Sequence, residues 1–288
     1  MNLRRQIFKG ALLAKSDPRL LFSMLRSRMQ TSLFPVPADR TIKQIGEVSI
    51  DLDFALGPQT KAMYYNAYEP ITVNVMKKYL RPGDTFIDVG ASIGYLSAVA
   101  ASLVGESGQV HSFEPSPEDF ERLQNLASKN PNFQFSMNPW AVGEVPGEGL
   151  LEISGLKWVG WNTMVPRFMR RDAFKEVRKV RVIRLDDYIL ERRNQMGKIS
   201  LIKIDTEGYE FPVLKGLCHY FESFQGTLAP LLCEITPRVH SLMGTNLKEM
   251  ANYMRSYEFR CVSLLDQKTV VDLTQLQGIT DVLFLPKN

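Results

Sequence analysis

The segment TFIDVGASIGYL, residues 85–96, constrains the fold more than any other part of the chain. Apolar and β-branched residues lead into Asp88, a glycine turn follows, and a helical pattern then begins, which is typical of a parallel strand that feeds a ligand-binding loop. Open α/β sheets bind their ligands at the carboxyl ends of such strands. Gly90 allows a sharp turn and a close approach of the backbone to a ligand, and Gly94 permits a tight helix start. The sequence therefore predicts an α/β fold with a ligand site at this turn.

Two acids end strand-like segments at this predicted site. Asp88 ends the first, and Glu114, 26 residues later, ends the second, QVHSFEP at residues 109–115. A dinucleotide diphosphate needs the bare amides of G-x-G-x-x-G, whereas Asp88 suits a ligand that carries an ammonium group or hydroxyls. An acid in the position of Glu114 can accept both ribose hydroxyls of a nucleoside. This order indicates an S-adenosylmethionine site, although either acid alone also fits a solvent-facing turn.

Four segments of the chain together resemble a known family. DVGASIGYLS, FEPSPEDFERLQNL, VIRLDDYI and LIKIDTEGYEFPVLKG occur in this order within roughly residues 64–240. They look like the successive blocks of FkbM-type methyltransferases, which use S-adenosylmethionine to methylate hydroxyl groups, often on sugars or polyketides. The resemblance implies a Rossmann-like seven-stranded sheet with helices on both faces and a reversed final hairpin. The family usually has Asn where this chain has Ser92, but serine can still donate and accept a hydrogen bond.

The resemblance also implies which residues contact the cofactor. Glu69, in a helix expected over residues 63–80, is a candidate contact of the methionine amino group, and a surface acid before Pro70 explains it equally well. Asn138 and Ala141 are expected to line the adenine pocket, with Trp140 as a stacking face. The expected cofactor contacts are Glu69, Asp88, Gly90, Ala91, Ser92, Gly94, Glu114, Pro115, Asn138, Ala141 and Asp205.

Acids gather again at the end of ISLIKID, residues 199–205, which has the pattern of a buried strand. Asp205 and Glu207 should lie beside the methyl group to be transferred. Methylation of an oxygen needs an oriented hydroxyl and a base, and a carboxylate suits that role. In the structural alternative, Asp205 caps the next helix and Glu207 is exposed or ion-paired.

A second strand end, LLCEI at residues 231–235, adds Glu234 to this edge. Asp205, Glu207 and Glu234 could instead hold Mg²⁺ or Mn²⁺, which would lower the pKa of a substrate hydroxyl. His240 is the one histidine of three that is expected at this edge, and is a further candidate base. The candidate catalytic residues are Asp205, Glu207, Glu234 and His240.

Residues 143–180 combine many glycines with Trp158, Trp161 and a basic run from Arg167 to Arg181. We expect a loop-rich insertion over the cofactor edge, where substrate specificity commonly resides. Tryptophan faces stack on sugars, although most tryptophans are simply packed. The basic run could attract a phosphate or an acidic glycan, or be ordinary solvated charge.

The first 40 residues hold eight Lys or Arg and two Asp, a net charge of +6, so the remaining chain is at −2. Basic and apolar residues alternate in a helical pattern that Pro18 interrupts. Such a helical arm could pack against the domain or a second copy in a homodimer, or bind anionic lipid or an acidic carrier. We assign residues 1–45 to the arm and 46–288 to the methyltransferase domain. No stretch reaches the ~18 apolar residues needed to span a membrane.

Composition and cysteine usage complete the prediction. The 288 residues are 44% apolar and 23% charged, which indicates a globular protein. Cys218, Cys233 and Cys261 show no C-x-x-C spacing and suggest reduced thiols in a cytoplasmic protein, either free or held at the membrane periphery.

The acceptor is expected to be a small molecule or a glycan. NPW at residues 138–140 is similar to the N-P-P-Y motif of nucleic-acid amino methyltransferases, but that motif belongs after the fourth strand, where this chain has IDTEG, so no nucleic acid is expected. Two other functions stay open: nitrogen or carboxyl methylation on the same fold, and a non-catalytic cofactor-binding partner in a biosynthetic assembly.

Overall fold

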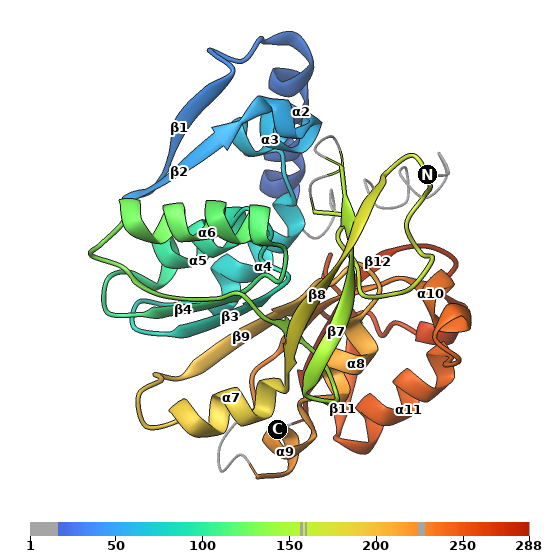
Figure 1. The fold of residues 1–288 in the computed structure, drawn as a ribbon. Coiled ribbons are helices and arrows are strands. Elements are labelled where there is room, and N and C mark those ends of the chain that lie inside the picture. The colour runs from blue at the N-terminus through green and yellow to red at the C-terminus, as the bar shows by residue number, and fades with distance from the viewer. Residues whose placement is uncertain (1–16, 156–157, 159, 224–227, 288) are drawn as a thin grey trace.

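A seven-stranded sheet forms the centre of the computed structural model, which describes residues 17–155, 158, 160–223 and 228–287 (Figure 1). The strand order is β11-β12-β10-β9-β3-β4-β5, and β12 alone runs antiparallel to its neighbours. The Rossmann-like sheet with a reversed final hairpin is therefore confirmed. The strands are β3 (Thr85–Val89), β4 (Gln109–Phe113), β5 (Gln134–Asn138), β9 (Ile199–Ile204), β10 (Leu231–Ile235), β11 (Phe259–Ser263) and β12 (Thr280–Pro286).

Helices cover both faces of this sheet (Figure 1). Every residue of β3 and β9 is buried, as expected of parallel strands with helices on either side. Successive side chains point to opposite faces, so Phe86 belongs to one core and Ile87 to the other. One face carries α4 (Pro70–Tyr79), α5 (Tyr95–Val104) and α6 (Pro117–Lys129); the other carries α7 (Leu185–Arg192), α8 (Glu210–Lys215), α9 (Cys218–Ser223) and α11 (Leu247–Ser256), with α10 (Pro237–Leu242) and the short 3₁₀ helix η3 (Leu273–Gln275) nearby.

The N-terminal part begins with α2 (Pro18–Leu33), capped by Asp17, whose Oδ1 accepts the N–H of Leu20 at 2.9 Å. A hairpin of β1 (Arg40–Ile45) and β2 (Val48–Asp53) follows, so the assigned limit at residue 45 falls inside this hairpin. Next come η1 (Phe54–Leu56) and α3 (Pro58–Tyr64). Helix α2 packs on α3 and α4. Among the described residues, no helix is long and apolar enough to cross a membrane.

The single helix expected over residues 63–80 is broken in the structure. Helix α3 ends at Tyr64 and α4 begins at Pro70, with Glu69 between them at a φ of 41°. Proline disfavours the helical conformation of the residue before it, which explains the break. The break turns Glu69 toward the carboxyl edge of the sheet.

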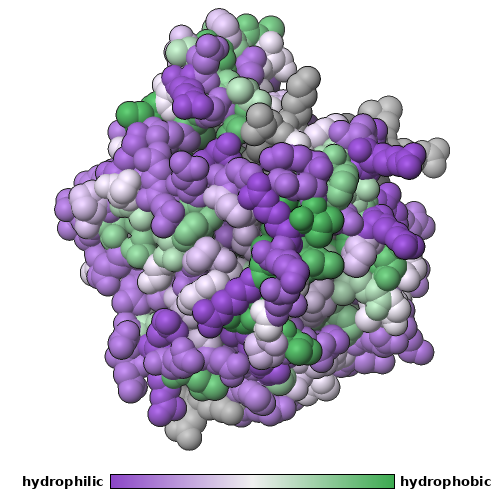
Figure 2. Space-filling model, in the orientation of Figure 1, coloured by the Kyte–Doolittle hydropathy of each residue, from purple (hydrophilic) through white to green (hydrophobic). Residues whose placement is uncertain are grey.

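The glycine-rich insertion is a second sheet and not the expected set of loops. β6 (Ala141–Val142), β7 (Gly147–Ser154) and β8 (Phe174–Ile183) form it in the order β6-β8-β7. Charged residues and valines alternate from Lys179 to Val182, so Val180 and Val182 are buried while Lys179 and Arg181 are exposed. Figure 1 shows β7 and β8 crossing in front of the main sheet, and Figure 2 shows apolar surface there, where Leu150 and Val177 are exposed.

Much of the basic run from Arg167 to Arg181 is paired with acids. Arg178 lies 3.0 Å from Glu118 and 2.7 Å from Glu176. Lys179 pairs with Glu148 on β7 at 2.7 Å. These contacts connect β8 to α6 and to β7, so the paired charges have a structural role.

Candidate functional site

A cavity with an empty volume of about 960 Å³ lies at the carboxyl ends of β3, β4 and β9. Its walls come from the loops after these strands, from the junction of α3 and α4, and from the insertion. The loops contribute Val89, Gly90, Ala91, Ser92, Glu114, Pro115, Asp205, Thr206 and Glu207; the helix junction contributes Gln59, Met63, Tyr68 and Glu69; the insertion and its approach contribute Trp140, Ala141, Leu151, Gly160, Asn162 and Met164.

The loop after β3 fits tightly against the loop after β9. Gly90 has a φ of +80°, and a Cβ atom on it would lie 1.8 Å from the carbonyl oxygen of Asp205. Only glycine fits this position. In return, the N–H of Asp205 donates to the carbonyl of Val89 at 3.0 Å. The two loops therefore form one rigid unit.

Ser92 and Glu114 join the β3 loop to the end of β4. Ser92 has a φ of 49°, a left-handed conformation in which asparagine is favoured, and this explains why the family usually has Asn there. The Ser92 N–H donates to Glu114 Oε2 at 2.9 Å, and the Ser116 N–H donates to Oε1 at 2.8 Å. Each carboxylate oxygen keeps a second lone pair for a ligand. Burial and the charge of Asp119 together raise the pKa of Glu114 to about 8, against the opposing effect of the two N–H donors.

Asp88 lies beneath the loop and does not reach the cavity. Its side chain is fully buried, and the Ser97 hydroxyl donates to its Oδ2 at 2.6 Å. Lys203 Nζ lies 3.3 Å from Asp88 Oδ1 and 3.3 Å from Asp205 Oδ2, and it donates to the Gly90 carbonyl at 2.9 Å. The expected contact of Asp88 with a ligand ammonium is thus replaced by an internal one, because Lys203 already supplies the cation.

Lys203 was not predicted to be a site residue; it is 4% exposed and is the penultimate residue of β9. Burial alone would lower its pKa, but the carboxylates of Asp205, Asp88 and Glu69 outweigh burial and raise the pKa above its ordinary value. A lysine inside an otherwise apolar strand was the available signal, since a buried lysine requires a paired acid.

Two further expected cofactor contacts do not line the cavity. Gly94 begins α5, and a Cβ atom there would lie 2.8 Å from the side chains of Leu123 and Leu126, so this glycine serves helix packing. Asn138 is buried, and its Nδ2 donates to the backbone carbonyls of Ser112 and Ser136 at 3.1 and 2.9 Å. Among the described residues, it is Trp140 and Ala141 that line the expected adenine side.

Asp205, Glu207 and Glu234 form an acid cluster. Each offers one carboxylate oxygen, and these oxygens lie within 4.8 Å of one another. Asp205 and Glu207 line the cavity, whereas Glu234 lies behind them, and its buried Oε1 has no hydrogen-bond partner in the described part of the chain. Glu210 orders the intervening loop, because its Oε1 accepts the N–H groups of Thr206 and Gly208 at 3.0 and 2.8 Å. Helix α8 begins at Glu210 with Tyr209 as its cap, so Asp205 is not the helix cap of the structural alternative.

Several carboxyl groups lie close together at this cluster, and their pKa values are raised. Burial, and next the charge of Asp205, raise the pKa of Glu207 well above its ordinary value. The same causes, with Glu207 added, raise the pKa of Glu234 to about 11. Burial and Asp205 also raise the pKa of Glu69, across the cavity, to about 7. The charge of Lys203 opposes the shifts of Glu69 and Glu207 without cancelling them, and Glu234, with a pKa of about 11, keeps its proton near neutral pH.

His240 is placed away from this cluster. It is buried in α10, with Nδ1 3.0 Å from the Thr245 hydroxyl and its ring against Phe211. Burial lowers its pKa. His240 is absent from the described residues that line the cavity, so its placement does not support a role as base.

The insertion forms one wall of the cavity, and hydrogen bonds attach it to α6 and to the loop after β9. Asn162 Nδ2 donates to Asp119 at 2.9 Å, and the Thr163 hydroxyl donates to the Glu207 carbonyl at 2.7 Å. The rings of Trp158 and Trp161 lie with centroids 4.7 Å apart and planes inclined by 52°, and Trp161 is 42% exposed next to the lining residues Gly160 and Asn162. The role of these tryptophans as a sugar platform stays a prediction.

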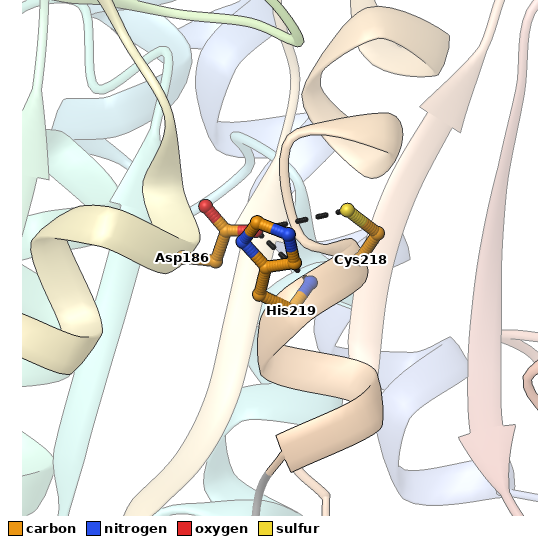
Figure 3. Close-up of side chains that lie close together, drawn as sticks. All are labelled: Asp186, Cys218 and His219. Carbon is orange, nitrogen blue, oxygen red and sulfur yellow. Dashed lines mark hydrogen bonds and ion pairs between the residues drawn. The ribbon is translucent and has the colours of Figure 1, made fainter.

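A second cluster, of Asp186, Cys218 and His219, lies between α7 and α9 (Figure 3). Arg184 binds both carboxylate oxygens of Asp186, at 3.0 and 2.7 Å, and the His219 N–H donates to Oδ2 at 3.0 Å. The Cys218 thiol lies 3.0 Å from Arg184 and 3.9 Å from Asp186. Donors therefore contact both carboxylate oxygens of Asp186. The hydrogen bond from His219 on α9 joins this helix to Asp186 on α7. The His219 side chain is 56% exposed, contrary to the core position that its apolar neighbours suggest.

Residues 88–261 match the model of the family described as the methyltransferase FkbM domain. This chain belongs to that family. It is an S-adenosylmethionine-dependent methyltransferase, as the four sequence segments suggested.

Two curated relatives carry more specific names. The 31-O-demethyl-FK506 methyltransferase FkbM of Streptomyces tacrolimicus is 28% identical over 212 residues, which cover 65% of this chain and 76% of the relative. The hexuronic acid methyltransferase AglP of Haloferax volcanii is 21% identical over 170 residues, covering 59% of this chain and 65% of the relative.

Among solved structures, the Methanococcus jannaschii fibrillarin pre-rRNA processing protein shares 12% identity at a TM-score of 0.43, covering 88% of this chain and 85% of that one. A likeness this low supports no conclusion.

Proposed function

We propose that this FkbM-family enzyme transfers the methyl group of S-adenosylmethionine to a hydroxyl group of a sugar, a glycan or a natural product. The observation that carries the proposal is the pair Asp205 and Glu207, which line the cavity and have opposite surroundings. Asp205 is paired with Lys203, whereas the half-buried Glu207 forms no ion pair with any residue that the structure describes. The names of the two curated relatives, one for a demethylated FK506 and one for a hexuronic acid, support oxygen in such a compound as the acceptor.

The chemistry of the lining residues fits this cofactor. Glu114 keeps lone pairs for ribose hydroxyls at one side of the cavity, and Glu69 offers a carboxyl for the methionine ammonium at another. Trp140 and Ala141 provide apolar surface for the adenine. When bound, S-adenosylmethionine supplies an electrophilic methyl group on a sulfonium.

Asp205 and Glu207 have different roles toward the acceptor hydroxyl. Asp205, held by the Lys203 ammonium 3.3 Å away, accepts the hydroxyl proton as the new carbon–oxygen bond forms. Burial and the charge of Asp205 raise the pKa of Glu207 and so favour its protonated form, which donates a hydrogen bond that orients the acceptor oxygen. Two carboxyl groups whose surroundings separate their protonation states are the usual arrangement for one acid and one base.

The same three carboxylates also provide oxygen ligands of the type that Mg²⁺ and Mn²⁺ bind, so the proposal needs a test against metal activation. We expect turnover to survive treatment with EDTA, because Lys203 already supplies a cation beside Asp205. Activity that disappears with EDTA and returns with Mg²⁺ or Mn²⁺ would replace the base mechanism by activation of the hydroxyl on the metal.

The acceptor class is tested with isotopically labelled S-adenosylmethionine. The panel contains macrolides with free hydroxyls, oligosaccharides with uronic acids, and neutral sugar nucleotides. We expect an ether product that resists mild alkali. A product that alkali hydrolyses would be a methyl ester, a methylated amine would place the reaction on nitrogen, and cofactor binding without transfer to any acceptor would indicate a non-catalytic partner; each contradicts the proposal.

A further inference from the structure

Helix α2 carries an apolar ridge on its outward face. Phe22, Leu25, Met29 and Leu33 follow one another at intervals of three or four residues, which places them on one side of a helix. Their exposed fractions are 71, 58, 53 and 69%. The opposite side, which contains the buried Ser27, packs on α3 and α4. A contiguous apolar surface of this kind marks a site of interaction.

Arginines border this ridge on both sides. At 100° per residue, Arg19 and Arg26 lie along one edge of the ridge and Arg28 lies along the other. All three are exposed, and α2 contains no Asp or Glu. Arginine can extend its apolar stem along an apolar layer while its charged end remains in a polar one. The outward face of α2 is therefore apolar at its centre and positive at its edges.

The charges decide between a second copy of the chain and a lipid surface. Two α2 helices that packed through their ridges would bring three guanidinium groups against three others, with no acid on either helix to pair with them. A bilayer with anionic headgroups offers an apolar interior and negative charge at its surface. Residues 1–16 add four Lys or Arg and no acid, and Asp17 caps α2, whereas residues 41–288 carry a net charge of −2. The attraction to negative charge is thus concentrated at this end of the chain.

We propose that α2 lies in the surface of an anionic bilayer, with its apolar ridge toward the acyl chains and its three arginines among the headgroups. The same helix packs on α3 and α4, whose junction supplies Met63 and Glu69 to the wall of the cavity. The attachment surface and the cavity wall therefore share one small group of helices.

The test is sedimentation of the full chain with vesicles. One preparation is phosphatidylcholine alone, and the other contains one-third phosphatidylglycerol. We expect binding to the anionic vesicles only, and weaker binding at high salt, because screening weakens surface electrostatics. Replacing Arg19, Arg26 and Arg28 together with Gln should weaken binding by at least about tenfold. Replacing Phe22, Leu25 and Met29 together with Ser should do the same, since it removes the buried apolar surface.

A matched control has Ser in place of Leu150 and Val177, which are 60 and 47% exposed on the insertion. This control should bind like the wild type. Equal binding of both vesicle types, or unchanged binding after the α2 substitutions, would overturn the proposal. A dimer in solution that the Phe22, Leu25 and Met29 substitutions dissociate would also overturn it, in favour of a second copy as the occupant.

Discussion

Two side-chain clusters of this enzyme, one around Asp186 and one around Asp205, differ in how well their acidic charges are matched. Around Asp186, one carboxylate meets the two nitrogens of Arg184 and a backbone N–H. Around Asp205, the carboxyl groups of Glu207 and Glu234 stand within 4.8 Å, and Lys203 pairs with Asp205. The first cluster joins α7 to α9, while the second faces the cavity.

The difference shows how a functional cluster can be recognised. An acid with a structural role has hydrogen-bond donors on both carboxylate oxygens, because an unpaired buried charge is costly. A site that must exchange protons or hold a ligand keeps acids whose pKa values are raised and whose lone pairs are free. The buried Oε1 of Glu234, which has no hydrogen-bond partner among the described residues, belongs to the second kind.

The largest expected difference between the clusters is in turnover. Asp205→Asn should lower turnover by about 10³-fold, since an amide cannot accept the hydroxyl proton, and should leave cofactor affinity nearly unchanged. Asp186→Asn should change turnover per folded molecule by less than about threefold, because Asp186 acts only on packing. Initial rates and calorimetric cofactor binding on both variants provide the measurement. Retention of most of the wild-type rate by Asp205→Asn would withdraw the catalytic role.

The stability of the second cluster depends on its single lysine. Lys203→Met should lower the free energy of unfolding by about 3–5 kcal/mol, because it leaves the fully buried Asp88 without a cation. Urea denaturation of the variant gives the value. Lys198→Met, at an exposed position just before β9, serves as the control and should be near neutral. Equal stability of the two variants would show that Lys203 does not neutralise the cluster.

A smaller effect is expected on cofactor affinity. Glu114 resembles Asp186 in that donors contact both of its oxygens, here two backbone N–H groups, and it resembles the Asp205 cluster in facing the cavity. Glu114→Ala should weaken the binding of S-adenosylmethionine by about 1–3 kcal/mol, because the hydrogen bonds to the ribose hydroxyls are lost. Thermal shifts measure this, and NAD should produce none with the wild type. Stabilisation by both nucleotides alike would contradict the cofactor site.

The smallest effect, when it is counted per unit of pH, concerns the ionisation of Glu234. Folded Glu234 keeps its proton to a pKa of about 11, while the unfolded carboxyl releases it near 4.5, so the free energy of unfolding should fall as the pH rises above about 4.5. Glutamine ionises in neither state, so the unfolding free energy of Glu234→Gln should change less with pH than that of the wild type. The two slopes should differ by at most about 1.4 kcal/mol per pH unit. Denaturation midpoints at pH 5 to 9 measure the two slopes. Parallel slopes would mean that Glu234 is already ionised in the folded protein.

Part of this structure was predictable because the signals are local. The largely apolar sequences of β3 and β9 predict buried parallel strands, and the order of Asp88, Gly90 and Glu114 predicts the cofactor edge. The final hairpin came from the family resemblance. The ordered sequence motifs also led to the correct family.

Other features depend on contacts between distant residues. Lys203 neutralises Asp88, 115 positions earlier, so that acid lies under the loop and not in the cavity. The insertion contains so many glycines that its period-two pattern was hidden, and its charges find partners such as Glu118 on α6. His240 faces Phe211 and Thr245 because α10 turns it into the protein, a direction that sequence spacing does not encode.

The contact between Gly90 and the Asp205 carbonyl also limits how this enzyme can diversify. Any side chain at Gly90 would displace the segment that carries Asp205, so the two cannot drift independently. The insertion is free of that constraint, since it reaches the cavity through side chains such as Asn162 and Met164. New acceptors should therefore arise by changes in the insertion, and directed evolution of this enzyme is best started with libraries there.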